Sequence, residues 1–226
     1  MKQKIFIMDS GILINLAMNG LLYILEDLKK DFNGKFIITK QVKYETIDNP
    51  LNVQKFELDA LEIKALLENK TIELPDSLNI PEPLLNRKTA ELMSIANHLL
   101  TRNNEPIKIV SEGEISCLAL SSILSEQDIE NIIGIDERTT RILSEKPENL
   151  EELMSRKLHT AVKLSTKNFS AFKEFKFIRS PEIVYTAYKK GILRIKDRRA
   201  LEAALYATKF KGSSISWNEI RILKKM

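Results

Sequence analysis

The sequence predicts an α/β protein in which helices cover both faces of a central parallel sheet, and three features support this prediction. Short apolar segments alternate with segments of helical periodicity along most of the chain. The apolar segments lack alternating polar residues, which is typical of strands buried on both faces of a parallel sheet. With 226 residues, 43% of them apolar, the chain is long enough to bury a large core. We therefore expect a three-layer α/β/α sandwich.

The first half of the chain contains two strand–helix pairs and an insertion. IFIMD at 5–9 predicts a strand, and 10–30 predicts one helix in which Ile12, Leu16 and Leu25 recur at helical spacing. KFIIT at 35–39 predicts a second strand, followed by a helix at 41–48. The segment 49–106 predicts a mostly helical insertion, with helices at 58–70 and 89–103 joined by a proline-containing link.

The second half repeats the strand–helix pattern. SEGEISCLAL at 111–120 predicts a buried helix, NIIGID at 131–136 a strand, and ERTTRILSE at 137–145 the next helix. FKFIRS at 175–180 predicts a fourth strand, after which Pro181 suits the start of a helix and Gly191 its C-terminal cap. Two further helices follow, the second beginning near Ser216. We expect one domain over 1–226, with the insertion at 49–106 and a basic segment with C-terminal helices at 146–226.

The composition excludes several classes of protein. Cys117 is the only cysteine, and His98 and His159 are the only histidines, so an internal disulfide and a Cys/His zinc cage are both excluded. No run of 18 apolar residues occurs, and Asp9 interrupts the N-terminus before a signal peptide forms, so a cytoplasmic protein without membrane segments is expected. P-loop and dinucleotide-binding fingerprints are absent.

Positive charge is concentrated in the C-terminal third. The net charge is +4, but 154–211 contains fifteen Lys and Arg against four acids, which gives +11 for that segment. This asymmetry indicates a polyanionic partner, although a solvated lysine-rich surface is an open alternative. The candidate nucleic-acid contacts are Lys173, Lys176, Arg179, Lys189, Lys190, Arg194, Lys196, Arg198 and Arg199.

Three phenylalanines are interleaved with these cations. Phe169, Phe172 and Phe175 lie among Lys167, Lys173, Lys176 and Arg179. Aromatic side chains among cations can stack on bases, but a spacing of three is equally that of a buried apolar stripe. We favour a place in the core for most of them.

Five acidic residues lie where a parallel sheet gathers its ligand site. Asp9 and Asp136 each end an apolar segment, Glu45 follows the second strand by one to two helical turns, and Glu112 and Glu114 begin a helix. In open parallel sheets the ligand site lies beyond the C-terminal ends of the strands. These carboxylates are therefore expected to face one edge of the sheet.

Helix capping is the alternative explanation for several of these acids. Asp9 or Ser10 can cap the helix that follows, and Asp136 can cap the helix at 137–145. Ser111 with Glu114 matches a capping box, and a Glu114 carboxylate turned back to cap Ser111 would not also face an ion. Glu45 matches no cap.

Convergence of these carboxylates predicts a metal site. Two carboxylates about 5 Å apart repel by roughly 3 kcal/mol at an effective dielectric constant of about 20. Mg²⁺ or Mn²⁺ removes this cost and prefers oxygen ligands. Such ions activate water and stabilise charge in phosphodiester hydrolysis.

In their order along the chain, IFIMDSGILINL, FIITKQVKYETI, SEGEISCLALS and IIGIDERTTRIL resemble the four motifs of the PIN-domain nucleases. The resemblance extends from Ile5 to Leu143, and the tail is similar to the C-terminal helices of longer prokaryotic members. It implies that Asp9, Glu45, Glu114 and Asp136 are the catalytic metal ligands, with Ser10 as the small hydroxyl residue beside the first acid.

The third motif also resembles the SEGE signature of flap endonucleases, which makes Glu112 a secondary candidate ligand. Ser116 departs from the family, because many PIN proteins have a second acid at this position. This departure leaves two alternatives: the metal is held more weakly, or Glu112 substitutes for the missing acid.

The resemblance implies a PIN-like sandwich that acts as a Mg²⁺- or Mn²⁺-dependent endoribonuclease on single-stranded or structured RNA. The role is that of a toxin, with an antitoxin as partner, or of an RNA-processing enzyme, and a homo-oligomer is also compatible. The alternative is a catalytically weak PIN-like module that binds RNA or acts as a scaffold. A phosphatase of the haloacid dehalogenase type fits less well, because Gly11 stands where that family needs a second Asp.

Overall fold

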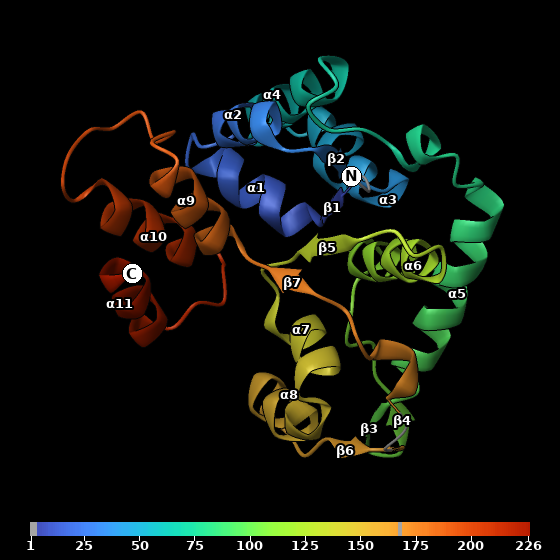
Figure 1. Ribbon diagram of the computed structural model, residues 1–226. Helices are drawn as coiled ribbons and strands as arrows, with labels where there is room; N and C mark the ends of the chain where they lie inside the picture. Colours follow the sequence, from blue (N-terminus) through green and yellow to red (C-terminus); the bar gives the residue numbers. More distant parts are fainter. Residues whose placement is uncertain (1–3, 167–168) are drawn as a thin grey trace.

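The computed structural model describes residues 4–166 and 169–226, and its centre is a four-stranded parallel sheet (Figure 1). The strand order is β2-β1-β5-β7, and the strands are β1 (Lys4–Met8), β2 (Gly34–Ile37), β5 (Asn131–Gly134) and β7 (Phe177–Ile178). The predicted α/β class and parallel sheet are confirmed. The fourth strand is the shortest, with only two residues in register with β5.

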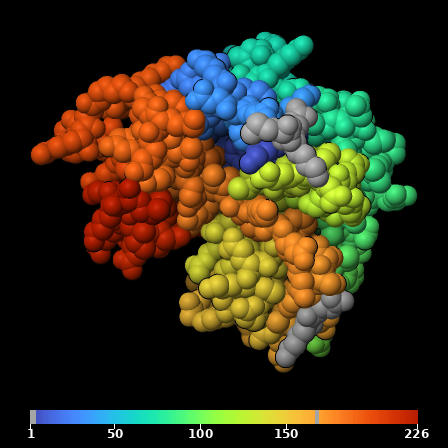
Figure 2. Space-filling view, viewed as in Figure 1, coloured from blue at the N-terminus to red at the C-terminus, as the bar shows by residue number. Residues whose placement is uncertain are grey.

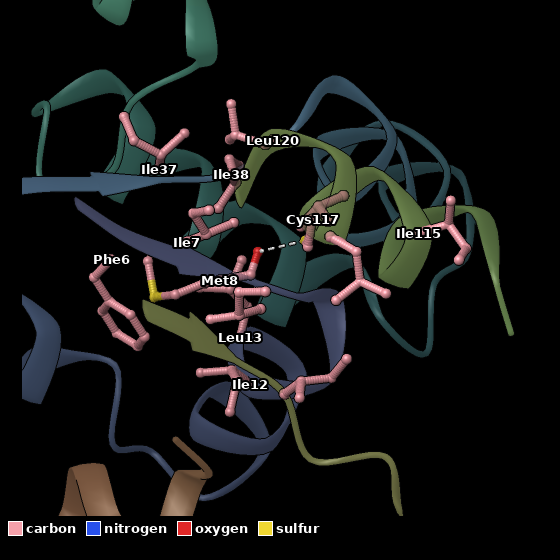
Figure 3. Packing of buried hydrophobic residues seen from close by; sticks show 14 of the residues in the cluster. Phe6, Ile7, Met8, Ile12, Leu13, Ile37, Ile38, Ile115, Cys117 and Leu120 are labelled. Atoms are coloured by element: carbon pink, nitrogen blue, oxygen red, sulfur yellow. Dashed lines mark hydrogen bonds between the residues drawn. The ribbon is translucent and has the colours of Figure 1, made fainter. Parts of the chain in front are cut away.

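Strand β1 lies in the interior of the sheet and is buried on both faces. Ile7 pairs with Ile37 on one side and Ile133 on the other, and all three side chains are fully buried. Helix α6 (Glu112–Glu126) packs on one face of β1 and β5, and α1 (Ser10–Met18) lies on the other face (Figure 3). Burial on both faces explains why the strands lack polar alternation.

The single helix predicted at 10–30 is wrong, because the chain forms two helices there. Helix α1 ends at Met18, and α2 (Tyr23–Asp31) continues at an angle of 117° to it. Gly20 has a φ of 62° and permits the reversal at the C-terminus of α1. The apolar spacing predicted one helix because α1 and α2 both bury leucines in the same core, so the pattern continues across the break.

Within residues 4–166 and 169–226, no single helix has the length and apolar character needed to cross a membrane. The bent pair of α1 and α2 reaches that length and composition only when its two helices are taken together.

The insertion is mostly helical, as predicted, but its last part is not. The helix predicted at 41–48 is present before it, as α3 (Lys40–Lys43) with a π-helical turn at Tyr44–Asp48. The insertion itself contains 3₁₀ turns at Pro50–Asn52 and Pro75–Leu78, α4 (Glu57–Glu68) and α5 (Glu82–Asn97). The helix predicted at 89–103 ends at Asn97. The last residues of the predicted segment form a strand, β3 (Leu100–Arg102), in a small antiparallel sheet with β4 (Glu105–Pro106) and β6 (Lys163–Leu164). Asn103 and Asn104 both have positive φ, which makes the tight turn between β3 and β4.

The rest of the chain forms two helical groups on either side of β7. Helices α7 (Arg138–Glu145) and α8 (Leu150–Leu158) lie on one side, and α9 (Ser180–Lys189), α10 (Ala200–Phe210) and α11 (Trp217–Lys225) on the other (Figure 1). Two 3₁₀ turns lie at Pro147–Asn149 and Ser170–Phe172. The predicted roles of Pro181 and Ser216 at helix starts are confirmed, and Gly191 has the positive φ of a C-terminal cap. Phe172 is fully buried and Phe169 is buried, which confirms the core interpretation for both.

Gly34 brings β2 close to β1, and replacing it with alanine is expected to lower the free energy of unfolding by about 3 kcal/mol or more. A Cβ atom at Gly34 would lie 1.9 Å from the carbonyl oxygen of Lys4, a backbone atom that cannot retreat without breaking the sheet. Chemical denaturation measures this loss. Gly20→Ala is the control: a Cβ there meets nothing within 4 Å, so only its left-handed backbone, worth about 1 kcal/mol, is penalised. Equal losses in the two variants would contradict the steric argument.

Candidate active site

Asp9 and Asp136 lie side by side at the carboxyl edge of the sheet. They follow β1 and β5, which are neighbouring parallel strands, and the Asp9 backbone N–H donates to the Gly134 carbonyl at 3.0 Å. Gly11 lies between the two acids, since a Cβ atom there would be 3.3 Å from Asp9 Oδ2 and 3.8 Å from Asp136 Cβ. The chain crosses from β2 to β5 over β1, so this edge is the topological switch point where α/β proteins bind ligands.

Asp9 is both a helix cap and the most strongly perturbed acid of the group. Its Oδ2 accepts the Gly11 backbone N–H at 3.2 Å, and the Ser10 hydroxyl donates to Oδ1 at 3.4 Å. The side chain is buried, with 4% exposed. Burial raises the pKa of Asp9 to about 7, with a further contribution from the negative charges of Glu114 and Glu45. The predicted cap is confirmed, and it leaves a buried carboxyl surrounded by like charges.

Glu114 forms the predicted capping box with Ser111. Its Oε2 accepts the Ser111 backbone N–H at 2.9 Å and the Thr140 hydroxyl at 2.9 Å. In the described part of the chain Oε1 has no hydrogen-bond partner. Burial raises the pKa of Glu114. The cap therefore occupies one oxygen, and whether the other can face an ion stays a prediction.

Glu45 reaches the same place from the π-helical turn after α3. The Gln41 amide donates to Glu45 Oε1 at 3.0 Å, and Glu45 Oε2 lies 2.5 Å from the position of a Cβ atom on Gly113. The carboxylate thus lies against the N-terminus of α6, beside Glu114. π-Helical turns are rare and are often found at functional sites, because the extra residue redirects the side chains around it.

A chain of hydroxyl groups fixes α3 against α6. The Thr39 hydroxyl and the Ser116 hydroxyl are 2.6 Å apart, Ser116 donates to the Gly113 carbonyl, and Thr39 accepts the Val42 backbone N–H. These roles are consistent only if Thr39 donates to Ser116. Ser116 is the residue at which the sequence departs from the PIN pattern. It is buried on α6 and links that helix to Thr39, the residue that caps α3.

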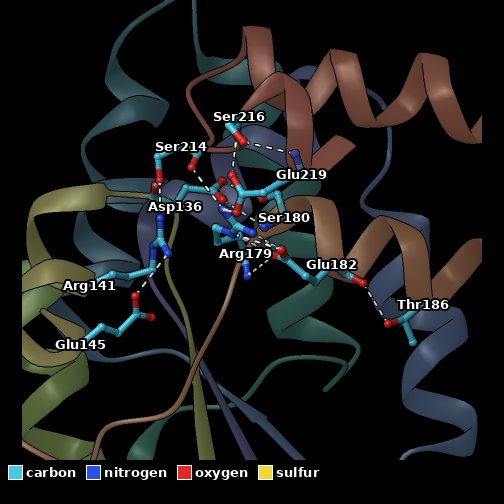
Figure 4. Close-up of polar contacts among 10 residues, drawn as sticks. All are labelled: Asp136, Arg141, Glu145, Arg179, Ser180, Glu182, Thr186, Ser214, Ser216 and Glu219. Atoms are coloured by element: carbon cyan, nitrogen blue, oxygen red, sulfur yellow. Dashed lines mark hydrogen bonds and ion pairs between the residues drawn. The ribbon is translucent and has the colours of Figure 1, made fainter. Parts of the chain in front are cut away.

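Asp136 is held by hydrogen bonds on both of its oxygens (Figure 4). The Ser180 backbone N–H donates to Oδ1 at 2.9 Å, and the Ser180 hydroxyl donates to Oδ2 at 2.7 Å. Oδ2 also accepts from the Asn15 amide at 3.2 Å. The prediction that Asp136 caps the next helix is wrong, because Glu137 caps α7 by accepting the Thr139 N–H. Asp136 instead binds the N-terminus of α9, since β7 brings that helix alongside β5. Burial raises the pKa of Asp136.

Three of the four acids, Asp9, Glu45 and Glu114, share an electrostatic environment, and the positive charge of Lys157 offsets part of it at Glu114. Asp9, Glu45 and Glu114 all raise the pKa of the buried Cys117 thiol, after burial itself. None of the four acids forms an ion pair with Lys or Arg in residues 4–166 and 169–226. As arranged, no three His, Cys, Asp or Glu side chains of the described residues are close enough together to hold one ion. The donors fit Mg²⁺ or Mn²⁺ in chemistry, because all are carboxylate oxygens and their charge is unbalanced.

Glu112 lies apart from the buried acids. It is exposed in the first turn of α6 and lines a cavity of about 320 Å³ between α3, α5 and α6. Thr39, Gln41 and Ser116 line the same cavity, so it opens beside the carboxylate group.

Several residues that hold the acids were not identified from the sequence: Asn15, Gln41, Thr140 and Ser180. Asn15 offered a signal, because it is a polar residue within the apolar helix ILINLAM and is buried. The partners of the other three come from distant segments or from the π-helical turn. Only the folded chain brings them to the acids.

Most of the candidate nucleic-acid residues have partners within the protein. Ion pairs join Arg179 to Glu182 and Glu219, Lys190 to Asp31, and Arg199 to Asp197. Lys189 and Lys196 donate to backbone carbonyls, and Arg194 stacks on the Tyr23 ring at 3.9 Å. Lys173, Lys176 and Arg198 are exposed. Lys167 lies outside the described residues.

Comparison of the chain with protein-family models, with curated proteins and with solved structures found no match. The fold and the site by themselves define an α/β protein with a four-stranded parallel sheet and buried acids at its carboxyl edge.

Proposed function

We propose that the protein is a metal-dependent endoribonuclease of the PIN type, in a toxin or RNA-processing role. The observation that carries this proposal is the group of unpaired acids at the carboxyl edge of β1 and β5. Asp9 has a pKa of about 7 because it is buried beside Glu114 and Glu45. Buried negative charge of this kind is costly unless a cation is bound, and its position is that of a ligand site in parallel sheets.

The proposed ligands divide into two pairs by the elements that carry them. Asp9 and Asp136 lie at strand ends, Glu45 lies on the π-helical turn after α3, and Glu114 lies on α6. A bound Mg²⁺ or Mn²⁺ would supply charge stabilisation for the scissile phosphate and activation of water. Thr140 and Gln41 orient the two glutamates through their hydrogen bonds.

A second candidate function is a PIN-like module that binds RNA with little catalysis. One observation favours it: both Asp136 oxygens already accept hydrogen bonds from Asn15 and Ser180, and Glu114 Oε2 is used by its cap. These contacts leave fewer free lone pairs for an ion. The two functions differ in whether Mn²⁺ binds at millimolar concentration.

We expect Mn²⁺ to stabilise the chain at pH 8, where Asp9 is ionised. An ion at 100 times its dissociation constant adds about 2.7 kcal/mol, which for a chain of this size raises the melting temperature by roughly 5–10 °C. Thermal unfolding with Mn²⁺ and with EDTA, together with titration calorimetry, measures the effect. Cleavage of single-stranded RNA under the same two conditions tests the activity. RNA binding with no Mn²⁺ binding would favour the scaffold.

A further inference from the structure

A positively charged cleft lies next to the acidic site, between α7 and α11. It has a volume of about 770 Å³, and its cationic side chains are Arg138, Arg141, Lys146, Arg179 and Lys209. Two acids, Glu145 and Glu219, line it as well, so cations exceed acids by five to two. Figure 2 shows the hollow between the surface of α7 and α8, in yellow, and the C-terminal helices, in red.

The cleft is joined directly to the carboxyl edge of the sheet. The Ser214 hydroxyl and backbone N–H both donate to the Asp136 carbonyl, at 2.6 and 3.3 Å. Two partly buried arginines bind the same residue, since Arg141 donates to the Ser214 hydroxyl at 2.8 Å and Arg179 to the Ser214 carbonyl at 3.2 Å (Figure 4). Ser214 thus lines the cleft and at the same time contacts the backbone of Asp136.

Two cations in the cleft, and one nitrogen of a third, lack a partner among residues 4–166 and 169–226. Arg141 Nε is buried without a hydrogen-bond partner there, and the ion pair of Arg141 with Glu145 is 3.7 Å long. Arg138 and Lys146 are exposed and form no ion pair with any described residue. Burial, and next the positive charge of Arg179, lower the pKa of Arg141. An anionic group in the cleft would satisfy Nε and separate the two like charges.

Exposed aromatic rings lie at one side of the same cleft. Trp217 lines it and is 51% exposed, and Phe210 beside it is 72% exposed. Their ring centroids are 6.0 Å apart, and the Lys209 ammonium lies 5.1 Å from the Trp217 ring. Rings exposed next to cations are the arrangement that holds unpaired bases, by stacking on the base while lysine and arginine bind the phosphates.

We infer that the α7–α11 cleft binds single-stranded RNA, with Arg138, Arg141 and Lys146 on the phosphates and Trp217 stacked on a base. The inference rests on the proposed ribonuclease function, which it extends by naming the path of the substrate to Asp136. A single strand is required because the bases of a duplex are paired and stacked away from side chains.

Trp217 is the only tryptophan in the chain, so its fluorescence reports on the cleft. We titrate the full chain with a 12-nucleotide oligouridylate in EDTA, where no cleavage interferes. Wild type is expected to show saturable quenching. Arg138→Glu with Lys146→Glu should weaken binding at least about 10-fold and lower the salt slope by about 1.4, for two phosphates lost.

Two further variants control for folding and charge. Lys55→Glu with Lys70→Glu changes the net charge equally on exposed residues near α4, and should alter affinity less than about 2-fold. Trp217→Ala, followed by fluorescence anisotropy of labelled RNA, should weaken binding about 5-fold or more, whereas Trp217→Phe should retain most of it. RNA binding without quenching, or equal losses in both charge pairs, overturns the inference. Quenching without cleavage by any metal overturns only the proposed nuclease.

Discussion

Asp9→Asn is expected to abolish RNA cleavage while making the metal-free protein more stable. The loss of activity should be at least about 10³-fold, because the substitution removes a charged ligand from the site where phosphate charge is stabilised. The gain in stability arises because the neutral amide is not penalised by burial beside Glu114 and Glu45. A residue that matters only for the fold would change both quantities in the same direction.

The stability gain depends on pH in a defined direction. In the folded chain Asp9 has a pKa of about 7, and its ordinary value is 3.8, so the folded state holds a proton that the unfolded state releases. Below pH 4 Asp9 is neutral in both the folded and the unfolded state, and its contribution to the free energy of unfolding is then fully present. The contribution declines as pH rises and is lost above pH 7, by a total of about 4 kcal/mol. Relative to wild type, Asp9→Asn should therefore gain stability between pH 4 and pH 7.

Chemical denaturation in EDTA at several pH values measures this difference, and RNA cleavage with Mn²⁺ measures the activity. Asp31→Asn is the matched control, because Asp31 is exposed and lies far from the acids, where it pairs with Lys190. It should leave both cleavage and the pH profile close to those of wild type. Equal cleavage by Asp9→Asn and wild type would refute the assignment of Asp9.

Gly113→Ala is expected to reduce cleavage about 10- to 100-fold with little change in stability. The added Cβ atom would lie 2.5 Å from Glu45 Oε2, so the Glu45 carboxylate has to move away from the N-terminus of α6. The fold tolerates this because the displaced atoms are the end of a flexible side chain. Alanine also favours a helix over glycine by about 1 kcal/mol, which offsets part of the steric cost.

A double-mutant cycle separates this effect from a general disturbance of α6. In a Glu45→Ala background there is no carboxylate to displace, so adding Gly113→Ala should cause no further loss of cleavage. Thermal unfolding of both variants provides the measure of stability. Full activity in Gly113→Ala, or independent losses in the double variant, would contradict a role for Glu45 at this position.

The local pattern of the sequence was sufficient to predict the sheet and the position of most of its acids. Uninterrupted apolar segments at 5–9 and 131–136 predicted buried parallel strands, because only strands covered on both faces exclude polar residues. Once β1 and β5 are neighbours, Asp9 and Asp136 meet by geometry. The capping boxes at Ser111 and Ser216 were also predictable, since each depends on residues three apart.

Features that depend on backbone irregularities were not predicted. Apolar periodicity continues across Gly20 and outweighed the turn signal of Asn19 and Gly20, so the break between α1 and α2 was missed. The π-helical turn that carries Glu45 has no signature in the residues, whereas the adjacent Asn103 and Asn104 are a turn signal at the end of an expected helix. In each case an irregular stretch of backbone changes the direction of the chain.

By itself, the sequence determined the α/β class, the parallel strands and the candidates among the acids, because these follow from periodicity and from the ends of strands. The tertiary structure decided which groups hold them. It placed Ser180 and Asn15 on Asp136, left Glu114 Oε1 free beside its cap, and brought Arg141 next to Arg179. These contacts join segments up to 121 residues apart. Residues so far apart meet only when the sheet order and the helix packing are fixed, and neither is encoded in any local pattern.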